Sequence, residues 1–301
     1  MPATHLHIDP FSGVAGDMML GALLDLRVGG KPLLPLEELK ADLAKLGLAD
    51  RFTLTAERTQ RCGVGGMDLK VRTPEGHHHR HRKDLLALAE KLGLSDRGHA
   101  RAVAAIDALA AAEARVHGTT IDEVHFHEVG AIDSIVDLLG NVLALELLGV
   151  ETLSCGPLPV GRGFVRCAHG LMPVPAPATA YLCEGLPTVG VDRTGELVTP
   201  TGAALVSTLC DTFGPPPAMT ARAIGYGAGD RDDPDVPNLL RVVLGEVGAA
   251  TRRAAASGHT HAEAHAHAHG HGMVHTHTHA HSHASHSHSH AHDHPHGDAG
   301  A

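Results

Sequence analysis

The chain has 301 residues, a formal net charge of −10 with neutral histidines, no Trp, two Tyr and five Phe. The acidic balance argues against a general binder of nucleic acids or acidic membranes, since both need a basic face, and few aromatic residues are available to stack on bases. Five cysteines form no CxxC pair, and neither an export signal nor an apolar window of about 18 residues is found. We therefore expect a cytoplasmic protein with reduced thiols and no membrane span.

The C-terminal stretch differs in composition from the rest of the chain. After Ser257 it holds 17 of the 28 histidines and no Leu, Ile, Phe or Tyr that could fill a core. We expect a folded body at residues 1–250 and a disordered, His-rich tail at residues 251–301. A body of this length can bury a sizeable core.

The first elements are predicted from alternating and helical patterns. Polar and apolar residues alternate over residues 5–9, which predicts a strand. The glycine-rich turn PFSGVAG and the amphipathic run DMMLGALLDL predict a loop and a helix after it. A second helix is predicted at 35–47, with Pro35 in its first turn and Gly47 at its end.

Further strands and helices alternate along the rest of the body. Ser95 as an N-cap and Gly118 as a stop frame a long Ala-rich helix. The other predicted elements are strands at 52–59, 69–73, 151–156, 163–168, 187–191, 220–227 and 238–246, and helices at 83–94 and from 199 onward. The histidine-rich loop EGHHHRHR precedes the helix at 83–94. This alternation predicts a mixed α/β body, whose topology the sequence does not determine.

Another helix, predicted at 129–149, has apolar residues at steps of three and four over most of its surface. Its one polar stripe consists of Asp133, Asp137 and Asn141, which project along one side because they are four residues apart. A buried carboxylate needs a partner or a metal ion. The stripe therefore marks this helix as a candidate for a functional role.

A metal site is predicted just before and within this helix. His125 and His127 are two residues apart and share one face of an extended segment, Glu128 follows directly, and Asp133 lies on the helix. Imidazole and carboxylate together suit Ni, Zn or Fe(II). The alternative is that one histidine caps the helix while the acids are solvated or hydrogen-bonded. The aspartates on an apolar helix favour the metal site.

A second candidate is the motif RCAHG, in which Cys167 and His169 are two residues apart and Arg166 is adjacent. A thiolate with an imidazole would favour a softer divalent ion. A buried cysteine is more often a small apolar residue, and that alternative stays open.

Glycine-rich loops could hold an anion at two predicted helix starts. Glycine after a strand is most often plain turn chemistry, so each loop alone is a weak signal. Their combination with arginines at 162 and 166 makes a phosphate-bearing small ligand plausible. The candidate residues are Ser12, Gly13, Gly16, Asp17, Arg162, Thr199, Thr201 and Gly202. A third loop, GYGAGDRDDPDVPN, is polar and could close over a ligand.

The tail has a density of imidazole groups that binds divalent nickel or zinc without any fold. The alternative is a solvated extension with no selected role. The tail histidines expected to bind metal are His259, His261, His265, His267, His269, His271, His275, His277, His279 and His281.

Six motifs, taken together, resemble the LarC family of nickel insertion proteins, which serve the nickel-pincer nucleotide cofactor of lactate racemase. The resemblance spans residues 5–246. In chain order the motifs are DPFSGVAGDMMLGALLDL, EGHHHRH, VHFHEVGAIDSIVD, GPLPVGRGFVRCAHGLMPVPAPAT, GELVTPTGAAL and IGYGAGDRDDPDVPN.

The resemblance implies a CTP-dependent cyclometallase, a lyase that places nickel into pyridinium-3,5-bisthiocarboxylic acid mononucleotide. Nickel is then bound by two thiocarboxylate sulfurs and by a ring carbon that loses its proton, and Mn²⁺ or Mg²⁺ assists the nucleotide. His127, Glu128 and Asp133 would act in catalysis, with His125 as a further nickel ligand. The two glycine-rich loops would hold the phosphate of this anionic substrate.

Family members usually continue for well over a hundred residues, and that region contains the CTP site. We therefore expect a C-terminal companion, or a longer frameshifted form, to supply CTP-driven catalysis. Two other functions stay open: nickel storage or delivery without catalysis, and a metal-dependent phosphohydrolase that uses the same His and Asp cluster.

Overall fold

The computed structural model describes residues 3–73, 80–126, 130–167, 169–231 and 233–248, and the backbone of two segments in the tail. The chain divides into a compact unit, Met1–Ala250, and a second unit, Thr251–Ala301. In the second unit the described residues form strands β16 (Ala262–Ala268) and β17 (Val274–Ala280), which pair antiparallel. The other tail positions, and all tail side chains, lie outside the description.

The body is built on a seven-stranded sheet with the order β13-β8-β1-β15-β14-β5-β4. The pairs β13/β8, β8/β1 and β14/β5 are parallel, and the pairs β1/β15, β15/β14 and β5/β4 are antiparallel. This mixture confirms the mixed α/β class. The strands are β1 (Ala3–Asp9), β4 (Thr53–Arg61), β5 (Val64–Arg72), β8 (Thr152–Cys155), β13 (Thr212–Phe213), β14 (Met219–Ala228) and β15 (Leu239–Val247).

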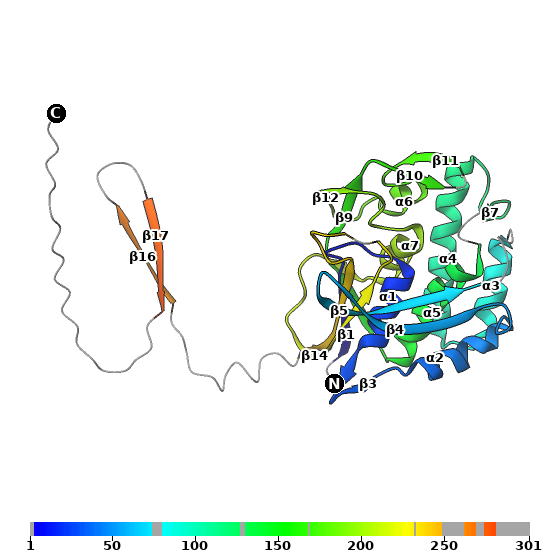
Figure 1. The fold of residues 1–301 in the computed structure, drawn as a ribbon, viewed down its shortest axis with the longest axis horizontal. Helices are drawn as coiled ribbons and strands as arrows, with labels where there is room; N and C mark the ends of the chain where they lie inside the picture. Colours follow the sequence, from blue (N-terminus) through cyan, green and yellow to red (C-terminus); the bar gives the residue numbers. More distant parts are fainter. Residues whose placement is uncertain are drawn as a thin grey trace, which may run out of the picture. The chain divides into compact units, whose positions relative to one another are not determined.

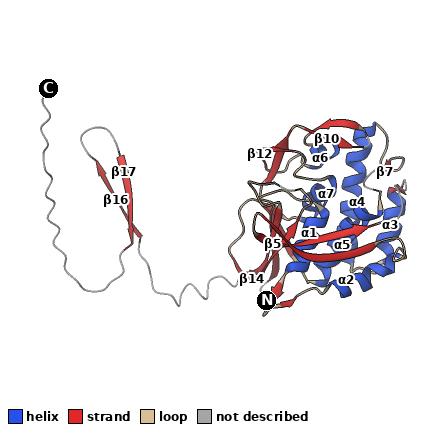
Figure 2. Ribbon diagram, in the orientation of Figure 1, coloured by secondary structure: helices blue, strands red, loops and turns tan. Residues whose placement is uncertain are grey.

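Helices cover one face of this sheet (Figures 1 and 2). They are α1 (Gly16–Asp25), α2 (Leu36–Leu43) with a 3₁₀ turn (Ala44–Leu46), α3 (Arg82–Lys91), α4 (Asp96–His117), α5 (Ile132–Leu147), α6 (Pro177–Leu182) and α7 (Pro200–Leu209). Helix α1 packs on β14, β5 and β15 and also contacts α5 and α7. In the described part of the chain, no helix combines the length and the apolar character needed to cross a bilayer.

Short strand pairs lie outside the large sheet. The strands β9 and β12 pair in parallel, and β10 and β11 pair antiparallel, close to α6 and one end of α4 in Figure 1. Their bounds, with those of two further pairs, are β2 (Arg27–Val28), β3 (Lys31–Pro32), β6 (Arg80–His81), β7 (His125–Phe126), β9 (Leu158–Arg162), β10 (Phe164–Cys167), β11 (Gly170–Pro173) and β12 (Thr188–Thr194).

The clearest helix signals in the sequence match the structure. The side chain of Ser95 accepts a hydrogen bond from the amide of Gly98 (3.2 Å), so it caps α4 as predicted, and Gly118 ends that helix with a left-handed φ of 63°. Gly47 ends the second helical segment in the same conformation, with φ 73°. These residues match because a hydroxyl cap and a left-handed glycine are local requirements of a helix end.

The connection from β13 to β14 crosses three strands with the five residues 214–218, which include three consecutive prolines, Pro215–Pro217. This connection is short for such a crossing, because neighbouring strands are about 4.8 Å apart and six extended residue steps reach only about 20–22 Å. With His7, Asp9 and Arg241 it lines a cavity of about 420 Å³.

Two glycines of β14 allow helix α1 to lie directly on the sheet backbone. A Cβ at Gly227 would lie 1.7 Å from the carbonyl oxygen of Met18, and one at Gly225 would lie 2.1 Å from that of Ala22. Because the obstacles are backbone atoms, no side-chain rotation relieves the clash. The two glycines of the sequence motif GYG are thus needed for the close packing of α1 on β14.

We expect Gly227→Ala to lower the free energy of unfolding by about 3 kcal/mol and the melting temperature by roughly 6–12 °C, because α1 must move away from β14. Thermal unfolding followed by circular dichroism measures this change. Gly190→Ala in β12 is the matched control, since a Cβ there meets no atom within 4 Å. Equal melting temperatures for the two variants would contradict the packing argument.

Candidate functional site

The two loops predicted to hold an anion lie side by side at the starts of α1 and α7. The amide of Val14 donates to the carbonyl of Leu197 (2.9 Å), and the amide of Thr199 donates to the carbonyl of Val14 (3.1 Å). A Cβ at Gly13 would lie 2.1 Å from the oxygen of Leu197, and one at Gly202 would lie 2.4 Å from that of Val14. These two glycines are therefore needed for loop-to-loop contact.

Several donors expected to cradle an anion already have partners in the protein. The buried hydroxyl of Ser12 accepts a hydrogen bond from Nη1 of Arg193 (2.8 Å). Thr199 caps α7 by accepting from the amide of Gly202 (3.1 Å), and its Oγ1 lies 3.1 Å from that of Thr201. The amide of Gly202 is thus used by the cap of α7, whereas the hydroxyl of Ser12, which accepts in its bond with Arg193, keeps its own proton to donate.

Residues in the polar stripe of α5 form hydrogen bonds with the first turn of helix α1. The N-cap residue Ala15 offers no side-chain acceptor, and the carboxyl of Asp137 accepts a hydrogen bond from the amide of Asp17 instead. Nδ2 of Asn141 donates to the carbonyls of Gly16 (2.8 Å) and Asp137 (2.7 Å). Two of the three residues in the predicted stripe thus satisfy the first turn of α1.

This capping places carboxyl groups close together in the interior. Burial raises the pKa of Asp137 well above its usual range, and the nearby charges of Asp17 and Asp133 add to the shift. Burial also raises the pKa of Asp17, and the carboxylate of Asp68 adds to the shift, while the hydrogen bond from the amide of Met18 and the charge of Lys70 oppose it. These shifts make it more favourable for a proton to bind to the carboxyls of Asp17 and Asp137 near the start of α1.

Asp17 lines a cavity of about 190 Å³, which we name the loop cavity. It is lined by Ala15, Asp17, Met18, Glu196, Leu197, Thr199, Gly229, Asp230, Arg231 and Asn238. The last four belong to the polar segment 229–238, which the sequence suggested could close over a ligand. The structure places that segment beside both helix starts.

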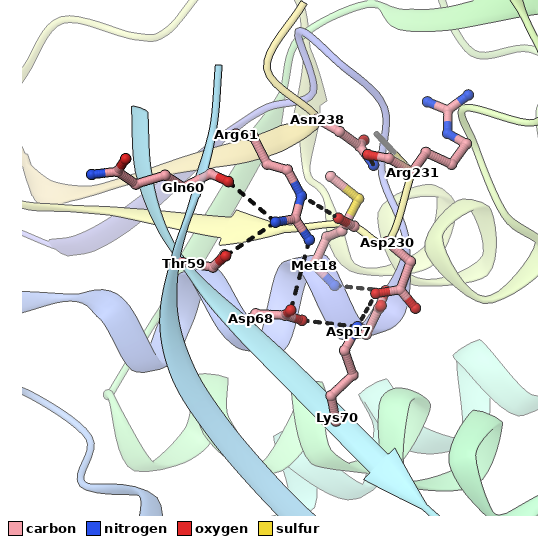
Figure 3. Close-up of polar contacts among 11 residues, drawn as sticks. Asp17, Met18, Thr59, Gln60, Arg61, Asp68, Lys70, Asp230, Arg231 and Asn238 are labelled. Atoms are coloured by element: carbon pink, nitrogen blue, oxygen red, sulfur yellow. Dashed lines mark hydrogen bonds and ion pairs between the residues drawn. The ribbon is translucent and has the colours of Figure 1, made fainter. Parts of the chain in front are cut away.

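Residues of the β4–β5 hairpin hold this segment, as Figure 3 shows. Nε of Arg61 donates to the carbonyl of Gly229 (3.0 Å). Lys70 forms ion pairs with Asp230 and, at 3.0 Å, with Asp68. The segment is thus anchored to the sheet by two cations.

A larger cavity, of about 430 Å³, lies between the end of α4 and strands β10 and β11, and we name it the thiol cavity. Its lining includes Cys167 and His169 from the predicted RCAHG site, together with Glu113 and His117 of α4. Glu196 lines this cavity as well as the loop cavity. The segment leading into α7 therefore separates two neighbouring cavities.

Four potential metal donors surround the thiol cavity. Sγ of Cys167 lies 4.0 Å from Nδ1 of His169, and the rings of His169 and His117 have centroids 4.9 Å apart. Nε2 of His117 lies 3.5 Å from a carboxyl oxygen of the largely buried Glu113. Burial lowers the pKa of His117, and the neighbouring His169 lowers it further, so a neutral imidazole is favoured.

The other predicted metal cluster is only partly described. His125 is exposed in β7, where its ring lies 4.0 Å from that of His81, and Asp133 is exposed in the first turn of α5. His127 and Glu128 lie outside the described residues, so this cluster stays a prediction. Within the described ranges, no group of three or more His, Cys, Asp or Glu is arranged to hold an ion as it stands.

The side chain of Arg162 is paired at the surface, although its carbonyl accepts a hydrogen bond from the amide of Gly195 (3.0 Å). It is exposed at the end of β9, where its Nε donates to Asp192 at 2.5 Å, and it lines neither cavity. Arg193 and Arg231 lie at the loops instead. Sequence reasoning missed both, and it missed His117 and Glu113, although their four-residue spacing on a helix was visible.

We expect Asp137→Asn to raise the melting temperature by about 2–4 °C at pH 7, or about 1 kcal/mol. A carboxyl with a raised pKa in the folded state opposes folding above its unfolded pKa of about 3.9, because ionisation is then favoured by unfolding. The gain should therefore vanish near pH 4. Differential scanning calorimetry from pH 4 to 8 tests this, with the exposed Asp50→Asn as control. A gain that does not change with pH would contradict the explanation.

Comparisons with known proteins identify relatives named for nickel insertion. A family model described as nickel insertion protein matches residues 6–269. A relative from Citrifermentans bemidjiense, named for nickel insertion, is 49% identical over 241 residues, which are 80% of this chain and 61% of the relative. No solved structure matches this chain.

Two further relatives have more specific names. Proteins of Staphylococcus epidermidis and Desulfitobacterium hafniense are named pyridinium-3,5-bisthiocarboxylic acid mononucleotide nickel insertion protein, and each is 44% identical to this chain. The matches cover 79% and 80% of this chain and 58% of each relative. This chain spans 58–63% of the length of the curated relatives it matches. With its family match over most of the sequence, this chain belongs to the nickel insertion protein family.

Proposed function

We propose that this protein takes part in inserting nickel into pyridinium-3,5-bisthiocarboxylic acid mononucleotide, and that nickel binds first in the thiol cavity. The names of two relatives support the substrate. The observation that carries the nickel site is the convergence of the Cys167 thiol with the imidazoles of His169 and His117 on one cavity. Sulfur and imidazole donors suit a late first-row divalent ion.

The distance between Cys167 and His169 fits a single ion between them. Metal–sulfur and metal–nitrogen bonds are about 2.3 and 2.0–2.1 Å long, so donors 4.0 Å apart correspond to an angle of about 130° at the ion. Small side-chain rotations would bring His117 closer. Two or three protein donors leave positions open for the two thiocarboxylate sulfurs of the substrate, which suits a cargo that must be released.

The neutral form of the His117 imidazole favours nickel binding at neutral pH. A metal ligand must be deprotonated, and the lowered pKa of His117 keeps its ring neutral. The nearby carboxyl of Glu113 can orient that ring, as carboxylates commonly do for histidine ligands of metals. Glu113 is thus a positioning residue in this proposal.

The remaining parts of the proposal concern groups beyond the thiol cavity. His125, His127, Glu128 and Asp133 could form a second nickel site, and one of them could accept the proton that leaves the substrate ring. The His-rich tail would concentrate nickel near the body. We further propose that the reaction is a CTP-dependent, lyase-class cyclometallation with Mg²⁺ or Mn²⁺, and that the product is the cofactor of lactate racemase. CTP binding would require a C-terminal part such as the longer relatives contain.

Nickel storage is the second candidate function, and the histidine density of the tail favours it. A storage protein would lose its function when residues 251–301 are deleted. An insertion protein supplied with excess nickel would keep turning over without them. Insertion into the mononucleotide, assayed with CTP, Mg²⁺ and the C-terminal part of a relative, separates the two.

We expect Cys167→Ser to abolish the thiolate-to-nickel charge-transfer absorption of the nickel-loaded protein, because the tail contains no cysteine that could give this band. Near-ultraviolet titration with nickel measures it. Cys62→Ser is the matched control, since that thiol is exposed on the β4–β5 hairpin and contacts the carbonyl of Asp233. An unchanged band in Cys167→Ser would rule out nickel binding by this thiol.

A further inference from the structure

We propose that Arg193 and Arg231 form a binding site for the phosphate group of a mononucleotide at the edge of the loop cavity. The identity of the ligand rests on the proposed function, whereas the preference for a phosphate group rests on the structure alone. This site replaces the role that the sequence suggested for Arg162.

Arg231 lies near Arg193 because it donates a hydrogen bond to Thr194, the residue that follows Arg193 in the chain. Arg193 donates from Nη1 to the hydroxyl of Ser12 (2.8 Å) and from Nη2 to the carbonyl of Phe11 (3.2 Å), so it is fixed against the loop before α1. Arg231 lines the loop cavity and donates from Nη1 to the carbonyl of Thr194 at 3.3 Å. Gly195, with φ 95°, lies next to this guanidinium.

Neither guanidinium forms an ion pair with a carboxylate of the described chain, although both are only partly exposed. This distinguishes them from Arg58, Arg61 and Arg162, which pair with Asp25, Asp68 and Asp192. Burial lowers the pKa of Arg231, and the positive charge of Arg193 lowers it further, so the two cations lie within electrostatic range of each other. Two neighbouring cations that no carboxylate of the described residues pairs with are costly, and a bound anion would relieve that cost.

The remaining donors suit a phosphate group. Nε of Arg193 and both Nε and Nη2 of Arg231 have no hydrogen-bond partner among the described residues. Guanidinium groups bind phosphate oxygens through parallel hydrogen bonds, and two of them can hold one phosphate from two directions. The starts of α1 and α7 add the partial positive charge of helix N-termini.

The acids of the loop cavity do not cancel this charge. Asp230 is paired with Lys70, and burial raises the pKa of Asp17, so its ionised form is less favoured than in water. Glu196 and Asp233 raise the pKa of Arg231, but less than burial and Arg193 lower it. Since Glu196 lines both cavities, a phosphate bound here would lie near the thiol cavity.

The test compares two ligands that differ by one phosphate group. Isothermal titration calorimetry at pH 8, without metal, measures the full chain with nicotinic acid mononucleotide and with its riboside. The mononucleotide should bind at least about tenfold more tightly, and inorganic phosphate should compete with it. Arg193→Gln and Arg231→Gln should each weaken mononucleotide binding by about tenfold or more, to the level of the riboside. The exposed Arg162→Gln should change it less than about twofold.

Equal affinity for the two ligands, or full affinity in both arginine variants, would overturn the proposal. If Arg193→Gln fails to fold, because this side chain holds the Phe11–Ser12 loop, Arg231→Gln decides. Among the described residues, the side chain of Arg231 donates a single, long hydrogen bond. Cys167→Ser should keep the preference for the mononucleotide even where its nickel band is lost. A failure of the nickel site and a failure of the phosphate site are therefore separate results.

Discussion

The backbone contact between the starts of α1 and α7 determines where both cavities lie. Val14 exchanges hydrogen bonds with Leu197 and Thr199, and Gly13 and Gly202 leave no room for a side chain between the loops. The same junction buries Asp137 against α1, where it satisfies an amide that Ala15 cannot cap. The same arrangement that brings the loops together and caps α1 therefore also buries the carboxyl of Asp137, which raises its pKa. Such an environment is common where a protein must control charge around a ligand.

The nickel site that we propose in the thiol cavity would be assembled from distant segments. The end of α4 contributes an imidazole and a carboxyl, and strands β10 and β11 with their turn contribute a thiol and a second imidazole. As it stands, the described chain does not gather three donors around one point. A cargo site needs enough affinity to collect an ion and too little to retain it against a sulfur-rich acceptor. The geometry of the cavity is consistent with that balance.

Much of the fold could be predicted because local chemistry specifies it. Alternation predicted β1, and a serine cap with a left-handed glycine predicted α4. The small strands such as β9 and β11, and the order of the large sheet, depend on contacts between distant segments and have no local signal. The same holds for the candidate sites: Cys167 and His169 are two residues apart and could be named as candidate ligands from the sequence, whereas Arg193 and Arg231 come near each other only through folding. Arg162 was expected to assist the glycine-rich loops, but Asp192 pairs with it at the surface.

The proline segment between β13 and β14 has a consequence for how this protein can vary. Residues 214–218 cross three strands in a short connection, and fixed φ angles keep the prolines extended in the unfolded chain as well. Removing one residue would pull an edge strand out of register, whereas adding one would only let the chain bow outward. Natural length changes in this connection should therefore be insertions, and circularly permuted forms should not be opened here.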